Sequence, residues 1–86
     1  QLKTIHAPTL IINGDEDDHC LNVGLYLKRI IPASGLLVLP KTGHTINLEE
    51  PEVFNRTLSE FLAQVSFDKW EPRDPRANPD QVMRTN

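Results

Sequence analysis

The amino-acid sequence predicts an α/β fold in which strand, helix, strand and helix follow one another. Two short runs with continuous apolar residues, 9–13 and 36–39, are each closed by a glycine or a proline. Such runs are typical of strands that are buried on both faces of a parallel sheet. Each run is followed by a longer stretch, 20–31 and then 51–65, in which apolar residues recur at helical spacing.

The first strand and the first helix have recognisable boundaries. Pro8 pushes the residue before it toward extended backbone, which suits the start of a strand over 9–13. Gly14 closes this strand and opens a turn rich in carboxylates. We expect the helix to run from about residue 20 to 31, because Pro32 stops it.

The second strand and the last helix are marked in the same way. Gly35 and Pro40 bound the strand 36–39, and the segment 41–48 is expected to be a loop. Pro51 suits the first position of a helix. The last helix then carries one apolar stripe, formed by Phe54, Leu58, Phe61, Leu62 and Val65.

Length and composition restrict the function classes. With 86 residues the chain fits at most one small domain, which we expect to be marginal without a partner. The net charge of −3 argues against a nucleic-acid partner, and no apolar run reaches the ~20 residues that span a bilayer. Cys20 is the single cysteine, so no internal disulfide can form, and a reducing, cytoplasmic location is expected. The three histidines show no paired zinc-ligand spacing.

Polar side chains follow both predicted strands. The carboxylates of 15–18 come directly after the first strand, and 41–44, which ends in Gly43-His44, follows the second. Ligands of parallel α/β sheets bind beyond the carboxyl ends of the strands, so these two loops should lie side by side. A carboxylate bonded to one ring nitrogen of a histidine fixes its tautomer and stabilises the imidazolium, as in two thirds of a catalytic triad.

The stretch from Ala7 to Val65 resembles the C-terminal end of the α/β-hydrolase superfamily. The resemblance rests on the joint order of three segments, Ala7-Pro8-Thr9-Leu10-Ile11-Ile12-Asn13-Gly14-Asp15-Glu16-Asp17, Leu39-Pro40-Lys41-Thr42-Gly43-His44 and Leu48-Glu49-Glu50-Pro51-Glu52-Val53-Phe54-Asn55. It implies the last strands and helices of a doubly wound, mostly parallel sheet, with the two helices on opposite faces. It also implies that Asp17 is the triad acid, that His44 is the base, and that the nucleophilic serine lies upstream.

Several alternatives to this assignment come from the residues themselves. Asp15 and Asp18 are rivals of Asp17 for the role of the acid. His19 and Cys20 are adjacent, and neighbouring side chains on a helix do not generally face each other, so Cys20 is interpreted as a small residue near the helix start. None of the three serines lies in the strained G-x-S-x-G turn that a nucleophile needs; these are Ser34, Ser59 and Ser66.

The sequence therefore predicts that residues 1–66 are the C-terminal segment of a hydrolase domain and 67–86 a tail, rich in proline and charge, that is extended or disordered. The chain begins at Gln1 and soon enters a strand, as a fragment would. We expect the parent to hydrolyse small esters, thioesters or lactones with no metal or organic cofactor, and this chain to be inactive alone. Its expected partner is the rest of the domain or a second copy.

Three alternative functions remain open from the sequence. An upstream aspartate nucleophile would give an epoxide or haloalkane hydrolase on the same fold. The chain could instead be a non-catalytic fragment that associates with itself through its apolar faces. The third alternative is a binding protein with this fold. Trp70, in the predicted tail, is expected to pack against the body of the protein.

Overall fold

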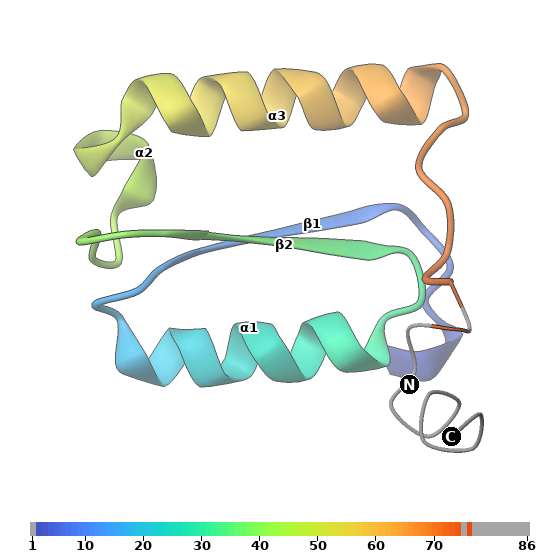
Figure 1. The fold of residues 1–86 in the computed structure, drawn as a ribbon, viewed down its shortest axis with the longest axis horizontal. Helices are drawn as coiled ribbons and strands as arrows, with labels where there is room; N and C mark the ends of the chain where they lie inside the picture. The colour runs from blue at the N-terminus through green and yellow to red at the C-terminus, as the bar shows by residue number, and fades with distance from the viewer. Residues whose placement is uncertain (1, 75, 77–86) are drawn as a thin grey trace.

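The structure, a computed structural model, describes residues 2–74 and 76 and confirms the predicted α/β order. Its elements are η1 (Leu2–Thr4), β1 (Thr9–Gly14), α1 (Asp18–Ile30), β2 (Ser34–Leu39), α2 (Ile46–Glu49) and α3 (Pro51–Ser66). Figure 1 shows α1 and α3 on opposite faces of the sheet that β1 and β2 form. The two helices therefore have the arrangement that the family resemblance implies.

The sheet of the described residues consists of two parallel strands. Thr9 lies opposite Ser34, and the register continues without a bulge to Gly14 opposite Leu39. Both strands thus end level with each other, at the side of the molecule where α2 lies (Figure 1). A sheet of two strands is at best marginally stable in water, so this pairing depends on further packing.

Several boundaries differ from the sequence prediction by one or two residues, and β2 begins at Ser34 rather than at residue 36. The first helix begins at Asp18, two residues before the predicted start, and the short helix α2 occupies part of the segment expected as a loop. The carbonyl of Thr45 accepts hydrogen bonds from the amides of Leu48 (3.0 Å) and Glu49 (2.9 Å), which closes this single turn. A turn of four residues has no apolar periodicity, so the sequence pattern could not predict it.

The apolar core is small. The buried apolar side chains among the described residues are Ile31, Ala33, Leu39 and Ile46. The last helix has no buried residue, and its apolar stripe is partly open to solvent, with 38% of Leu58 and 54% of Leu62 exposed. The helix predicted from the apolar stripe is therefore present, but no residue of 2–74 or 76 covers the stripe completely.

Trp70 holds the described part of the predicted tail against the body. Its indole N–H donates a 2.8 Å hydrogen bond to the carbonyl oxygen of Ala33, and its ring meets the edge of Phe61 at a centroid distance of 4.7 Å. Residues 69–74 have no helix or strand, while residues 75 and 77–86 of the predicted tail lie outside the described residues. Trp70 thus lies against both the start of β2 and α3.

Gly35 leaves the space that the indole of Trp70 occupies. A Cβ atom at Gly35 would lie 2.6 Å from Cη2 and 2.7 Å from Cζ2 of Trp70. We expect Gly35→Ala to push the indole outward and to lower the free energy of unfolding by about 1–3 kcal/mol, the usual range for overpacking. Since Trp70 is the single tryptophan, its fluorescence emission should shift to the red.

Gly24→Ala is the matched control for this substitution. A Cβ at Gly24 would meet the side chain of Asn13. Gly24 belongs to α1, which lies on the opposite face of the sheet from α3. The free energy of unfolding should therefore fall without a shift of the Trp70 emission. An unshifted spectrum in Gly35→Ala would contradict the close approach of Gly35 and Trp70.

Candidate active site

The two loops after the strands are held together by backbone hydrogen bonds. The amide of Asp15 donates to the carbonyl of Leu39 (2.9 Å), and the amide of Glu16 donates to the carbonyl of Thr42 (3.0 Å). These bonds continue the contact of β1 and β2 beyond the last strand residues. The predicted juxtaposition of the two loops is therefore present in the structure.

Tight backbone packing sets the path of the second loop. A Cβ atom at Gly14 would collide with the carbonyl oxygens of Thr42 and Gly43, so only glycine permits this approach. The side chain of Thr42 is buried, and its hydroxyl donates a 2.9 Å hydrogen bond to the carbonyl of Pro40. Lys41 has a φ of 54°, in the left-handed region, which turns the chain back toward Gly14.

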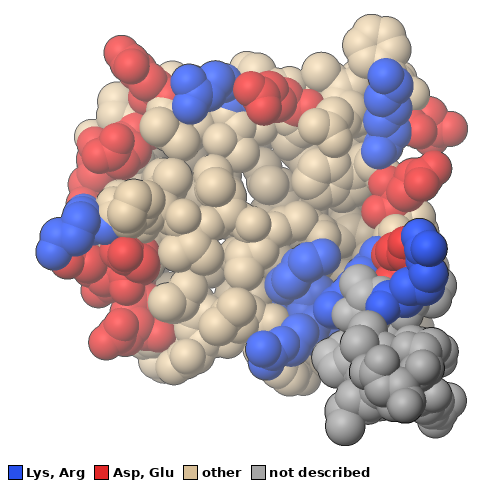
Figure 2. Space-filling model, viewed as in Figure 1, with Lys and Arg blue, Asp and Glu red and all other residues tan. Residues whose placement is uncertain are grey.

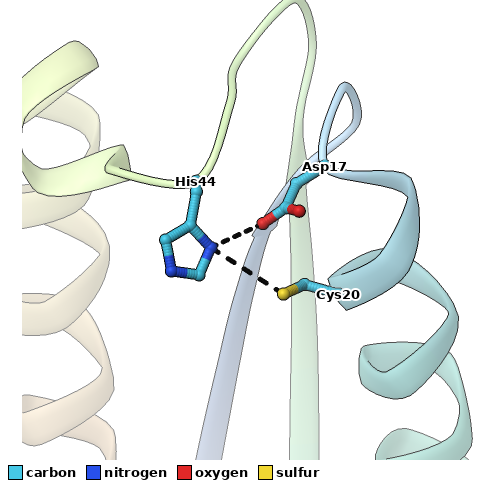
Figure 3. A group of neighbouring side chains, drawn as sticks. All are labelled: Asp17, Cys20 and His44. Carbon is cyan, nitrogen blue, oxygen red and sulfur yellow. Dashed lines mark hydrogen bonds and ion pairs between the residues drawn. The ribbon is translucent and has the colours of Figure 1, made fainter.

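Asp17 and His44 meet across the two loops. Nδ1 of His44 lies 2.7 Å from Oδ2 of Asp17, a distance typical of a charge-assisted hydrogen bond in which the ring N–H donates. Figure 3 shows Nε2 on the far side of the ring from Asp17. The side chain of His44 is 77% exposed and that of Asp17 only 20%, so the carboxylate is the more enclosed member of the pair.

The carboxylate is held in its charged form by this contact. The hydrogen bond from His44 lowers the pKa of Asp17 below its ordinary value, and a second hydrogen bond from Cys20 lowers it further. Asp17 immediately precedes α1, at its N-cap position, where the partial positive charge of the helix N-terminus also favours an anion. An ionised carboxylate is what a triad acid needs to orient and stabilise an imidazolium.

Of the three aspartates in the loop after β1, Asp17 is the one that forms the described hydrogen bond with His44. Asp18 is exposed in the first turn of α1, and Asp15 is half-buried with one carboxylate oxygen enclosed. The geometry therefore favours Asp17 over the two rivals that the sequence left open.

Glu49 braces the loop that carries His44. Its Oε1 accepts a 3.0 Å hydrogen bond from the amide of Gly43, and its Oε2 accepts a 3.1 Å bond from the hydroxyl of Thr45. The two residues that it binds flank His44 directly, so Glu49 fixes the backbone from which the imidazole projects.

Cys20 is the neighbour that sequence reasoning missed. Its Sγ lies 3.8 Å from Nδ1 of His44, and the contact with Asp17 raises the pKa of the thiol. Asp17 and Cys20 are three residues apart at the start of α1, a spacing that brings side chains to the same face of a helix. That spacing is the signal in the sequence that places Cys20 beside Asp17.

The side chains of Asp17, Cys20 and His44 also form a group that could hold a metal ion. One donor atom from each lies within 4.8 Å of the other two (Figure 3). Around them, the carboxylates of the loop after β1 and of α2 gather at one end of the molecule, on the left in Figure 2. Lys41 partly offsets this charge through an exposed 2.9 Å ion pair with Glu16.

Comparisons with known proteins give a consistent set of relatives. No protein-family model matches the chain. A putative 2-succinyl-6-hydroxy-2,4-cyclohexadiene-1-carboxylate synthase of Bacillus subtilis is 31% identical over 65 residues, which are 76% of this chain and 24% of that protein. A 2-hydroxy-6-oxononadienedioate/2-hydroxy-6-oxononatrienedioate hydrolase of Pseudomonas putida is 41% identical over 63 residues, 72% of this chain and 22% of that protein.

A solved structure agrees with these sequence relatives. MenH from S. aureus superimposes with a TM-score of 0.71 at 33% sequence identity, over 73% of this chain and 24% of that one. The chain thus spans about a quarter of the length of the proteins that it matches. Within residues 2–74 and 76, no helix is both long and apolar enough to cross a bilayer.

The brace formed by Glu49 should depend on pH. The hydrogen bond from the Gly43 amide, and then that from Thr45, lower the pKa of Glu49. A carboxylate with a lowered pKa supports the loop at neutral pH, and this support is lost as the pH falls through that lowered pKa. We expect the Gly43 amide to be protected from hydrogen exchange at neutral pH and to lose relative protection in acid.

Glu49→Ala should remove this protection at every pH. Glu50→Ala serves as the control, because the bonds to Gly43 and Thr45 are made by Glu49 and not by its neighbour. The measurement is amide hydrogen exchange of Gly43 followed by NMR. Equal protection of Gly43 in both variants would show that Glu49 does not brace the loop.

Proposed function

This chain is related to the α/β-hydrolase superfamily, and from that relationship we propose that it is the C-terminal part of a serine-type hydrolase. In this proposal Asp17 is the acid and His44 the base of a catalytic triad. The observation that carries it is the 2.7 Å hydrogen bond between Oδ2 of Asp17 and Nδ1 of His44. The relatives also include an uncharacterized hydrolase of Bacillus subtilis, 35% identical over 63 residues.

The pair can perform the proton transfers that acyl transfer needs. Asp17 holds Nδ1 as the protonated nitrogen, so the lone pair of neutral imidazole lies on Nε2, which faces away from Asp17 (Figure 3). Nε2 then takes the proton of an upstream serine as the serine attacks, and later returns it to the leaving group. The charge of Asp17 stabilises the imidazolium in between. The exposure of His44 in this chain leaves room for the nucleophile to approach.

The proposed substrate is a small ester, thioester or lactone. Two relatives are hydrolases of 2-hydroxy-6-oxononadienedioate, which by its name is a small dicarboxylate. Those names support a small-molecule substrate that carries a carbonyl group. The proton transfers proposed for the Asp17–His44 pair require no metal or organic cofactor. The proposed location of the protein is the cytoplasm.

The rest of a hydrolase domain is the proposed partner of this chain. Apolar side chains stay exposed on both helices, among them Val23 and Tyr26 of α1 and Leu62 of α3. Figure 2 shows a broad surface without charged side chains in the middle of the molecule. In the same view, Figure 1 shows the sheet there, between α1 and α3. Further strands of the parent would pair with this sheet and cover these side chains, since a large exposed apolar surface marks an interface.

Two substitutions test the triad in the whole hydrolase that contains this chain. His44→Ala should abolish hydrolysis of p-nitrophenyl acetate, because no base remains. Asp17→Asn should lower kcat by up to about 10⁴-fold, the loss that a mis-set histidine tautomer causes in a serine protease. Asp18→Asn is the control, and this exposed residue should tolerate the change. A greater loss in Asp18→Asn or Asp15→Asn than in Asp17→Asn would refute the assignment of the acid.

The 86-residue chain itself should show no hydrolysis above a His44→Ala control, because its three serines lie outside a nucleophile turn. The size of the chain in solution, taken on the same sample, reports whether the exposed apolar surface pairs two copies. Turnover by the chain that is lost in His44→Ala would mean that it carries its own nucleophile, and the proposal of a divided triad would fail.

A further inference from the structure

We propose that Asp17, Cys20 and His44 form a binding site for a zinc-like divalent cation, which switches the Asp17–His44 pair off when it binds. The binding follows from the three side chains alone. The effect on catalysis rests on the proposed function, because it concerns the same histidine. The site uses Cys20, a residue to which the triad assigns no role.

The donor atoms already lie close to the distances that coordination requires. Tetrahedral zinc, with bonds of about 2.0–2.3 Å to N, O and S, separates its ligand atoms by roughly 3.4–3.6 Å. The Sγ of Cys20 is 3.8 Å from Nδ1 of His44, and all three donor atoms lie within 4.8 Å of one another. Nδ1 and Oδ2 of Asp17, now 2.7 Å apart, would separate by less than about 1 Å to admit the ion.

The chemistry of the donor set selects the ion. A thiolate and an imidazole favour zinc and similar soft or borderline cations, whereas magnesium and calcium prefer oxygen ligands only. Three protein ligands leave one tetrahedral position open, and the exposure of His44 gives solvent access to it. The gathered carboxylates at this end of the molecule add a field that attracts cations (Figure 2).

Cation binding changes the proton arrangement of the histidine. The ion needs the lone pair of Nδ1, so the proton that Nδ1 donates to Asp17 leaves this nitrogen. Neutral imidazole then carries its proton on Nε2, and Nε2 has no lone pair with which to accept a proton from serine. The thiol of Cys20 also releases its proton to solvent when it binds as thiolate. The cation and the catalytic hydrogen bond therefore exclude each other.

Cobalt(II) titration of the 86-residue chain tests the binding directly. Cobalt occupies zinc sites, and a cobalt–thiolate bond gives a charge-transfer absorption in the near ultraviolet. We expect this band to appear at one cobalt per chain and to vanish in Cys20→Ser. His44→Gln should weaken cobalt binding by more than roughly tenfold. Loss of a residue that only hydrogen-bonds a metal ligand already costs about that much affinity, and His44 is a ligand itself. His19→Gln, at the exposed neighbour of Cys20, is the matched control and should bind as the unmodified chain does.

Absence of the thiolate band, or equal cobalt affinity in the unmodified chain and in His44→Gln, would overturn the proposed site.

Zinc inhibition of the whole hydrolase tests whether the bound cation switches the Asp17–His44 pair off. Zinc should inhibit ester hydrolysis reversibly, with recovery after addition of a chelator, and the remaining activity of Cys20→Ser should be at least tenfold less sensitive. A cobalt band without any hydrolase activity would remove the proposed function and keep the site, whereas hydrolysis without the band would remove the site and keep the function.

Discussion

The continuous parallel contact of β1 and β2 is the constraint on which the rest of the site depends. The register brings Gly14 level with Leu39, and two further backbone hydrogen bonds join the loops just beyond these residues. Because both strands end at the same edge, the carboxylate after the first and the imidazole after the second can meet only there. A shift of the register would separate Asp17 from His44 by the length of the shift, about 3.3 Å for each residue.

The imidazole is positioned from several sides by groups with no chemical role of their own. Gly14 lets the second loop pass against the end of β1, and Thr42 anchors that loop in the interior. Glu49 accepts hydrogen bonds from the amide of Gly43 and the hydroxyl of Thr45, on either side of His44. Asp17 then needs only its place at the start of α1 to reach Nδ1. A largely exposed histidine thus has a defined orientation because its backbone is fixed, although its ring is open to solvent.

The same structure is incomplete as a hydrophobic unit. A two-stranded sheet carries a helix on each face, yet the last helix buries none of its residues fully. Trp70 compensates at one end, where it joins Ala33 and Phe61. The chain matches about a quarter of each relative, so a small core and exposed apolar stripes are what a segment of a larger sheet would have. The site, in contrast, lies at the edge where hydrogen bonds already join the two described loops.

The sequence by itself determined the order of the elements, the parallel pairing of the strands and the edge on which the candidate site lies. Apolar runs bounded by glycine and proline define strands through local backbone preference, and Pro8, Pro32 and Pro51 act within one or two residues of their positions. The choice of Asp17 among three nearby aspartates was predicted from a motif, and only the tertiary structure brought its carboxylate within hydrogen-bond distance of His44.

The tertiary structure alone decided which side chains accompany that pair. The positions of Cys20 and Glu49 beside His44 depend on contacts between segments far apart in the chain, which local propensity does not encode. The short helix α2 and the docking of Trp70 on Gly35 are of the same kind. Local pattern thus set the elements, while packing between them set the surroundings of the histidine, because those contacts exist only after the strands have paired.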